Sequence, residues 1–247
     1  MKTAILLSTY NLDAAYLQAQ LASIEAQTLP CTLVQRDDTE THLGAMKSFE
    51  KLLAETEGFD YYAFADQDDV WKPEKMEVLM TAMQKAEKQF GTQTPLVVHC
   101  DLEVVDAELK PMARSFWRYA GLKPSVINDN LHYLTISNTV TGCAMLLNAA
   151  ARKASLPFGK QAYMHDQWIA QSALRAGGKV IPVPEALVLY RQHGSNTLGA
   201  VEHHFGLHDV QLKRRLFWQS YRAGKGICWR TLAGFLYWKT RHLLVRL

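Results

Sequence analysis

Strand-length apolar runs alternate with longer helical patterns through the first hundred residues, and this alternation restricts the folds that are open to the chain. It is typical of βαβ units around a mainly parallel sheet. The sequence therefore predicts an α/β fold with a Rossmann-like sheet flanked by helices. The expected strands are Thr3–Thr9, Thr32–Arg36, Tyr61–Ala65 and Leu96–Cys100, and the expected helices are Ala14–Gln27, Ala45–Glu57 and Pro73–Phe90.

The regular alternation weakens after residue 100. The segment Ser137–Asn148, with the sequence SNTVTGCAMLLN, is expected to form a buried strand entered through a turn at or before Gly142. A helix is expected at Asp166–Arg175, because the Gly177-Gly178 pair is a good stop signal. Two short strands are then expected, at Val180–Val183 and Ala186–Tyr190.

The charge distribution divides the chain into two parts. Residues 209–247 hold nine Lys and Arg against one acid, whereas residues 1–208 hold 18 basic and 23 acidic side chains. A chain of 247 residues is near the upper limit for one compact core. We therefore expect a catalytic domain at 1–208 and a basic helical segment at 209–247. Four widely spaced cysteines and no secretory leader favour a reducing cytoplasm.

The basic segment also carries seven aromatic residues. It has no apolar run near the roughly 20 residues that span a bilayer, and basic helices with aromatic anchors suit the membrane interface. The segment is thus expected to lie on an anionic membrane surface. Helices packed on the catalytic domain and a nucleic-acid tail are the alternatives. The aromatic residues are Phe217, Trp218, Tyr221, Trp229, Phe235, Tyr237 and Trp238.

Polar and acidic residues follow the predicted strands where each one ends. In a parallel sheet, the ligand crevice lies beyond the carboxyl ends of the strands. Four strands that bring polar groups to one edge therefore predict a site. These strand ends are Thr9-Tyr10-Asn11, Arg36-Asp37-Asp38, Asp66-Gln67-Asp68-Asp69 and Asp101.

The acidic turn after Tyr61–Ala65 brings Asp66, Asp68 and Asp69 together. Their mutual repulsion would be relieved by a hard divalent cation, and Mg²⁺ or Mn²⁺ is typically held by carboxylates together with substrate phosphates. The turn therefore predicts a diphosphate-binding metal site. The alternative is a solvated turn that caps the following helix.

Seven motifs, taken in their order and spacing, make the sequence resemble the inverting family 2 glycosyltransferases of GT-A fold, in particular the bacterial rhamnosyltransferase-like branch. The resemblance covers roughly residues 3–200. The two residues after the paired aspartates depart from the family, which usually has Gly-Ser where Thr39-Glu40 stand here. The departure affects the expected shape of the pocket for the nucleoside base. The motifs are LLSTYN at 6–11, RDD at 36–38, KSFEKLL at 47–53, FADQDDVWKPEK at 64–75, TGCAMLLN at 141–148, MHDQWIA at 164–170 and LYRQHGSNTLGA at 189–200.

The resemblance implies a role for most of these polar residues. The metal site is expected to consist of Asp66 and Asp68 with His193, and Asp69 is a further candidate. Asp166 is the expected general base, and the alternative is that it is a helix N-cap. A carboxylate that takes the acceptor proton contributes typically about 10²–10⁴-fold to the rate. The residues expected to contact the nucleotide sugar are Thr9, Tyr10, Asn11, Asp37, Asp38, Asp66, Gln67 and Arg191.

Other conspicuous side chains have more ordinary explanations. His165 is interpreted as a packing or acceptor-contact residue, and Lys47 and Lys51 as a solvated helix face. Tryptophans after strands are more often part of a core than sugar-stacking platforms. This applies to Trp71, Trp117 and Trp168.

The residues and the resemblance together predict an enzyme that moves a sugar from a UDP- or dTDP-linked donor to a hydroxyl of a glycan or lipid-linked acceptor, at the inner face of a bacterial plasma membrane. The dTDP donor and rhamnose as the sugar are implied by the resemblance alone. Mn²⁺ or Mg²⁺ is the expected cofactor, and cell-surface polysaccharide synthesis the expected setting. The alternatives are a sugar-phosphate nucleotidyltransferase and a non-catalytic scaffold of a polysaccharide assembly complex. Residues 8–13 are neither a glycine-rich phosphate loop nor a GxGxxG motif, which argues against a nucleotidyltransferase and a Rossmann dehydrogenase.

Overall fold

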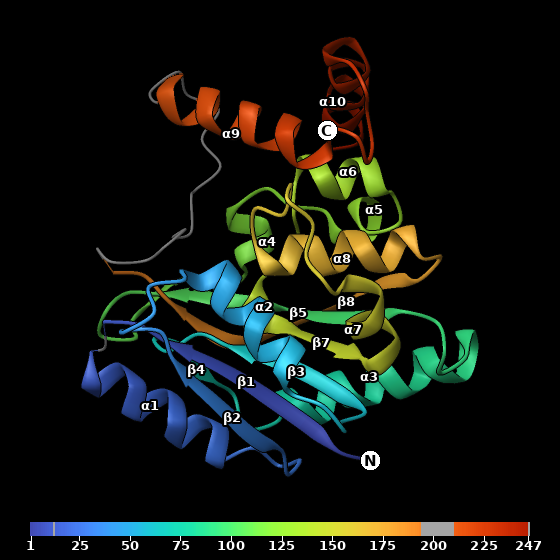
Figure 1. Ribbon diagram of the computed structural model, residues 1–247. Coiled ribbons are helices and arrows are strands. Elements are labelled where there is room, and N and C mark those ends of the chain that lie inside the picture. Colours follow the sequence, from blue (N-terminus) through green and yellow to red (C-terminus); the bar gives the residue numbers. More distant parts are fainter. Residues whose placement is uncertain (12, 194–209, 247) are drawn as a thin grey trace.

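The computed structural model describes residues 1–11, 13–193 and 210–246 (Figure 1). Its strands are β1 Thr3–Thr9, β2 Thr32–Asp37, β3 Tyr61–Ala65, β4 Val70–Trp71, β5 Leu96–Val105, β6 Pro111–Ala113, β7 Met145–Asn148 and β8 Lys179–Arg191. Its helices are α1 Ala14–Glu25, α2 Ala45–Glu55, α3 Lys75–Phe90, α4 Phe116–Tyr119, α5 Pro124–Ile127, α6 Leu131–Ile136, the 3₁₀ turn η1 Gly142–Ala144, α7 Ala149–Ser155, α8 His165–Arg175, α9 Val210–Gly224 and α10 Leu232–Arg246.

The strands form one sheet in the order β2-β1-β3-β7-β5-β8-β4, with β6 paired to β5. The α/β prediction is confirmed, and the sheet is mixed: β1, β2, β3, β5 and β8 run in one direction, whereas β4, β6 and β7 run in the other. Among the described residues, β1 pairs in parallel with β2 and β3, and β5 with β8, whereas the four other pairings are antiparallel. The apolar pattern of a buried strand is the same in both directions, so the sequence carried no signal for the reversal at β7.

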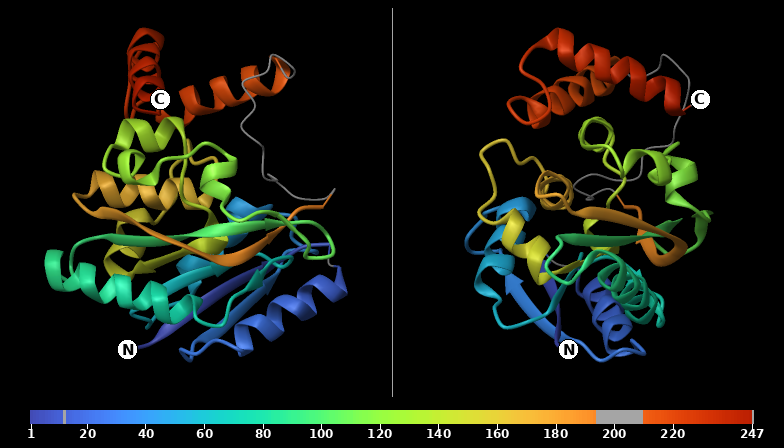
Figure 2. Two further views of the ribbon diagram at one scale, coloured as in Figure 1. Left: turned by 180° about the vertical axis from the view of Figure 1, so that it is seen from behind. Right: turned by 90° about the vertical axis from the view of Figure 1, so that its right-hand side faces the viewer.

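Helices cover both faces of this sheet, and each face has its own apolar core (Figures 1 and 2). Helices α1 and α3 lie on one face, where Met76, Leu79 and Met83 repeat at helical spacing and are fully buried. Helices α2, α7 and α8 lie on the other face, where Phe49 and Ile169 are buried. The two cores hold the sheet in place from both faces, and with it the carboxyl ends of β1 and β3.

Three predictions in the second half of the chain need correction. The expected strand Ser137–Asn148 is a strand only at Met145–Asn148, because η1 occupies the residues before it. The two expected strands after Gly177 are one continuous strand, β8, which follows β5 through irregular register near Cys100 and Asp101. Strand β5 itself continues to Val105, so Asp101 lies within it and not at its end.

Asp101 is therefore structural. It is buried, and its carboxylate accepts hydrogen bonds from the Ser115 hydroxyl at 2.5 Å and the Trp117 amide at 3.1 Å. These bonds fix the start of α4, and the expected contribution of Asp101 to the strand-end site is wrong.

The C-terminal helices α9 and α10 lie against α6 (Figure 1). The Trp238 ring stacks on His132 with 3.8 Å between centroids, and the Ser220 hydroxyl donates to the Ile136 carbonyl. Phe235 and Trp229 are buried. Part of the aromatic content of the basic segment thus serves packing on the catalytic domain. The expected boundary at 208/209 lies outside the described residues.

Candidate active site

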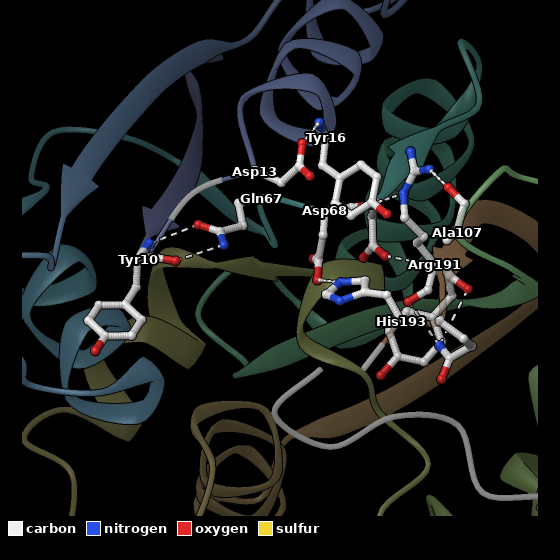
Figure 3. Close-up of polar contacts among 11 residues, drawn as sticks. Tyr10, Asp13, Tyr16, Gln67, Asp68, Ala107, Arg191 and His193 are labelled. Atoms are coloured by element: carbon white, nitrogen blue, oxygen red, sulfur yellow. Dashed lines mark hydrogen bonds and ion pairs between the residues drawn. The ribbon is translucent and has the colours of Figure 1, made fainter. Parts of the chain in front are cut away.

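The residues that follow β1, β3 and β8 lie together at one edge of the sheet (Figure 3). The Gln67 side chain joins two of these ends, because its carbonyl accepts from the Tyr10 amide at 2.8 Å and its amide donates to the Tyr10 carbonyl at 2.9 Å. The two hydrogen bonds fix the acidic turn relative to the end of β1. Gln67 was expected to contact the donor. Its side-chain oxygen and nitrogen are instead both bonded to the backbone of Tyr10.

Two carboxylates and a thiol form the inner part of the acidic turn. Ligand atoms of Asp66, Asp69 and Cys143 all lie within 4.8 Å of one another. Asp69 is fully buried, and its Oδ2 has no hydrogen-bond partner among the described residues. Burial, followed by the charges of Asp68 and Asp166, raises the pKa of Asp66 to about 7. Burial and the charges of Asp68 and Asp66 raise the pKa of Asp69 well above its ordinary value.

Lys75 is the residue of this site that the sequence did not identify. It was expected on an ordinary helix, yet it is fully buried, and its ammonium donates to the Cys143 carbonyl at 2.6 Å and lies 2.9 Å from the centroid of the Trp71 ring. Burial lowers the pKa of Lys75 to about 8, against the opposing influence of nearby groups that include Asp69 and Asp66. The only signal in the sequence was that Lys75 ends the FADQDDVWKPEK motif, because Trp71 lies on β4 and does not share a helix face with Lys75.

Asp68 and His193 form the outer part of the site. The His193 Nε2 and Asp68 Oδ2 atoms are 2.8 Å apart, and both side chains are largely buried. The ring of Tyr16, from the first turn of α1, lies 5.3 Å from the His193 ring. The structure thus brings the late histidine of the LYRQH motif to the acidic turn. The rest of that motif, from residue 194, lies outside the described residues.

Arg191 connects the end of β8 to the same turn. Its Nε donates to the Asp68 carbonyl at 2.7 Å, its Nη1 donates to the Ala107 carbonyl, and its backbone amide donates to Asp69 Oδ1 at 3.1 Å. The guanidinium also lies 4.2 Å from the centroid of the Tyr16 ring. Arg191 is buried, so its charge is close to the carboxylates while its hydrogen bonds hold the backbone of the turn.

Asp166 lies in the first turn of α8 and is almost fully buried. Burial raises its pKa to about 6, although hydrogen bonds from the Gln167 and Gly142 backbone and from the Asn138 side chain oppose this increase. The N-cap of α8 is Met164, so the alternative explanation of Asp166 as a helix cap is wrong. The Asp166 charge in turn contributes to the raised pKa of Asp66, so the two carboxylates lie within electrostatic range.

The paired aspartates after β2 differ in their surroundings. Burial alone would raise the pKa of Asp38, but hydrogen bonds from the Thr41 hydroxyl and the Leu43 and Gly44 amides outweigh it and lower the pKa. Asp38 is therefore occupied in ordering the loop before α2. Asp37 is exposed, and hydrogen bonds from Thr39 lower its pKa. Only Asp37 of the pair presents its carboxylate to solvent.

The three residues at the end of β1 also differ. Thr9 is buried, and its hydroxyl donates to the Arg36 carbonyl at 3.4 Å. Tyr10 is 49% exposed, with its ring edge-on to His42 at 5.6 Å. Asn11 is exposed and has a φ of 47°, a conformation that asparagine adopts more readily than most residues. Of the three, Tyr10 and Asn11 are accessible to a ligand.

The ordinary explanations of the remaining side chains are confirmed. Trp71, Trp117 and Trp168 are buried, so none is a sugar-stacking platform. His165 is packed between Phe49 and Phe64, with ring centroids at 4.3 and 5.0 Å, and burial lowers its pKa to about 3. Lys47 and Lys51 pair with acids on the exposed face of α2.

The residues at the acidic turn fit a divalent cation. They offer carboxylate oxygens and one imidazole, which suit Mn²⁺ and Mg²⁺, and a buried carboxylate oxygen of Asp69 lacks a hydrogen-bond partner among the described residues. Burial is the main reason that the pKa values of Asp66 and Asp69 are raised, and repulsion from the neighbouring carboxylates adds to it.

No family model matches the sequence. An uncharacterized glycosyltransferase of Haemophilus influenzae is 25% identical to the chain over 157 residues, which are 62% of this chain and 47% of that protein. The chain is similar to a glycosyltransferase. It spans about half the length of this curated relative.

Solved structures of S. aureus TarS have a similar fold. TarS 1-349 in complex with UDP-GlcNAc superimposes with a TM-score of 0.57 at 15% identity, covering 89% of this chain and 66% of that chain. TarS 1-349 alone gives a TM-score of 0.54 at 17% identity, covering 76% and 60% of the two chains. The complex of TarS 1-349 with UDP gives 0.53 at 16% identity, covering 78% and 61%. The fold of this chain is GT-A-like.

Proposed function

We propose that the chain is an inverting glycosyltransferase that moves a sugar from a nucleoside-diphosphate donor to a hydroxyl acceptor. The observation that carries this proposal is the position of Asp166, a nearly buried carboxylate within electrostatic range of the acidic turn at Asp66–Asp69. The turn matches a donor diphosphate with its cation, and a carboxylate with a pKa of about 6 matches a general base at neutral pH. Similarity to a glycosyltransferase in sequence supports the same assignment.

Asp166 carries the proton transfer in this proposal. The acceptor hydroxyl gives its proton to the Asp166 carboxylate while its oxygen forms a bond to the anomeric carbon. The bond from that carbon to the diphosphate oxygen breaks on the opposite face, so the anomeric configuration inverts. The Asn138 side chain and the Gly142 backbone, which form hydrogen bonds with Asp166, hold the carboxylate in position.

Asp66, Asp68, Asp69 and His193 would hold Mn²⁺ or Mg²⁺, which supplies positive charge to the departing diphosphate. The chain's own groups prepare this site. Gln67 holds the turn against the end of β1, and Arg191 holds the Asp68 carbonyl and the Asp69 carboxylate from β8. In this proposal the Tyr10 ring and the Asp37 carboxylate, which are both exposed, contact the nucleoside.

The donor is proposed to be a UDP- or dTDP-sugar. The TarS complexes with UDP-GlcNAc and UDP favour a uridine nucleotide, whereas the resemblance of the motifs favours a dTDP-linked rhamnose. A panel of UDP-, GDP- and dTDP-sugars, scored by nucleotide release with Mn²⁺ and with EDTA, tests both the activity and the donor. No Mn²⁺-dependent release from any donor would contradict the proposed function and leave a non-catalytic scaffold. Release of pyrophosphate from a nucleoside triphosphate and a sugar phosphate would instead show a nucleotidyltransferase.

The basic segment is proposed to attach the enzyme to the inner face of the plasma membrane. Within the described residues, no helix has both the length and the apolar character needed to cross a bilayer. Helix α10 nevertheless exposes an apolar face, on which Leu243 and Leu244 are 55% and 66% exposed. Lys239 and Arg241 flank this face, and apolar helix faces bordered by cations bind anionic interfaces.

Co-sedimentation with phosphatidylglycerol vesicles tests this attachment. The double variant with Leu243→Ser and Leu244→Ser should bind severalfold more weakly than the parent chain, since two apolar side chains no longer enter the interface. The matched control is Met112→Ser on β6, which removes a 55% exposed apolar side chain elsewhere. Equal vesicle binding by all three proteins would contradict the membrane proposal.

A further inference from the structure

A cavity of about 400 Å³ lies between α9 and the loop that leads into α8. The loop contributes Lys160 and Tyr163, and α9 contributes Arg215, Trp218 and Arg222. The three α9 residues are three and four positions apart, so they share one face of the helix. Figures 1 and 2 show α9 extending over this side of the molecule, above the helices that cover the sheet.

The cavity is strongly cationic. Lys160, Arg215 and Arg222 line it together with neutral residues, and no acid is among its lining residues. None of the three cations forms an ion pair with a carboxylate in the described part of the chain. Uncompensated cations around a concave surface attract anions, and arginine binds carboxylate and phosphate groups through paired hydrogen bonds. The cavity is therefore suited to an anionic ligand.

Two aromatic rings accompany these cations. Trp218 and Tyr163 both line the cavity and are 40% and 42% exposed. Elsewhere in the catalytic domain the tryptophans Trp71, Trp117 and Trp168 are buried. An exposed aromatic ring offers an apolar surface with a polar edge, which suits the C–H face of a sugar ring. Cations and aromatic rings together describe a site for a sugar that carries a negative charge.

The cavity is close to the proposed general base. Tyr163 precedes Asp166 by three residues, so their Cα atoms are at most about 11 Å apart. Asp166 is in the first turn of α8, and the lining loop ends where that helix begins. A saccharide held in the cavity therefore lies beside the segment that leads into the first turn of α8, where Asp166 stands.

We propose that this cavity binds an anionic sugar of the acceptor, one that carries a phosphate or carboxylate group, while an adjacent hydroxyl is placed at Asp166. The inference rests on the proposed function and adds to it the chemical class of the acceptor. It assigns Arg222, Arg215 and Lys160 to the anionic group and Trp218 to the sugar ring.

Binding without donor tests the cavity separately from the transfer reaction. The probes are trehalose 6-phosphate, digalacturonic acid and neutral trehalose, titrated calorimetrically into the full chain. We expect the two anionic probes to bind at least about tenfold more tightly than trehalose, because a charge-assisted hydrogen bond is stronger than a neutral one. Arg222→Gln and Lys160→Gln should each weaken anionic probe binding by about tenfold. Lys160 lies on the loop before α8 and Arg222 lies on α9, so the two variants test opposite walls of the cavity.

Arg230→Gln is the matched control, because it removes one exposed charge from the basic segment outside the cavity lining. Equal weakening by Arg230→Gln and Arg222→Gln, or no preference for anionic probes, would overturn the proposal. Phosphatidylglycerol vesicles form a second arm. If Arg222→Gln weakens vesicle binding more than Arg230→Gln does but leaves the soluble probes unaffected, the cavity binds a lipid headgroup and the acceptor assignment is wrong. Failure of the proposed function would appear instead as absent donor turnover with intact probe binding.

Discussion

Replacing Asp166 with asparagine is expected to inactivate the enzyme and to stabilise its fold above pH 6. The reason is that burial raises the pKa of Asp166 from the usual 3.8 to about 6. Below pH 3.8 the carboxyl is protonated in the folded and the unfolded chain, so it does not affect the balance between them. Between these two pKa values the folded chain binds the proton more tightly. Above pH 6 both states are ionised, and the buried charge disfavours the folded one.

The size of this effect follows from the same two pKa values. A difference of roughly two in pKa corresponds to about 3 kcal/mol lost from the free energy of unfolding at pH 8. Asparagine has no charge to bury and keeps an oxygen that can accept the hydrogen bonds of the Gln167 and Gly142 backbone. In a chain of this size, about 3 kcal/mol raises the unfolding temperature by on the order of 6–12 °C.

Thermal unfolding of the parent chain and of Asp166→Asn, measured in EDTA at pH 4 and pH 8, checks this prediction. The variant should unfold at a higher temperature at pH 8 and at nearly the same temperature at pH 4. Glu185→Gln, which neutralises an exposed acid on β8, is the control and should change neither temperature by more than a degree or two. Equal unfolding temperatures at pH 8, or the same gain at both pH values, would refute the reasoning that the Asp166 charge is costly to bury.

Further predictions concern activity and packing. The transfer rate should fall as the pH drops through about 6, because Asp166 accepts a proton only when ionised. Asp166→Asn should lower the transfer rate by roughly 10²-fold or more without a comparable loss of donor affinity. Asp68→Ala should abolish Mn²⁺-dependent donor turnover while circular dichroism stays unchanged, and normal turnover would remove Asp68 from the cation site. Gly142→Ala should lower the free energy of unfolding by several kcal/mol, since an added Cβ would lie 2.3 Å from His165 Nε2. Urea titration should show a smaller loss when the same substitution is made in a His165→Ala background. Trp238→Ala should lower the free energy of unfolding by about 2–4 kcal/mol because its ring packs on α6, and an unchanged urea midpoint would contradict that packing.

The first half of the fold could be predicted because its signals are local. Strands β1 and β3 are apolar runs that end abruptly in polar residues, and the helices between them have buried residues at helical spacing. The same signals placed Asp66, Asp68 and the end of β1 at one edge. No structure was needed to expect a site there.

The errors have equally physical reasons. The two strands expected after Gly177 are one strand, because β8 stays paired with β5 through an irregular register. Lys75 has the sequence surroundings of a solvated helix residue, and its burial beside the Asp66 and Asp69 carboxylates depends on where the strands bring Cys143. Such long-range contacts leave no periodic pattern in the sequence.

The roles of the strand-end residues could be predicted as a group but not one by one. Asp37 and Asp38 are chemically identical neighbours, and only the loop that folds back onto Asp38 distinguishes them. Similarly, the aromatic residues of the basic segment suggested membrane anchors. Phe235 and Trp229 are instead buried, whereas the leucines of α10 are exposed.

The paired hydrogen bonds between Gln67 and Tyr10 have a consequence for attempts to change the donor of the proposed transferase. They join the loop proposed to meet the nucleoside to the turn proposed to hold the diphosphate, so neither can move without the other. A library that randomises residues 9–11 to accept a new base will therefore also shift the acidic turn, and many of its members will bind the new donor in an unproductive position. Retaining Gln67, or varying it together with the loop, is the condition under which donor choice and turnover can be selected independently.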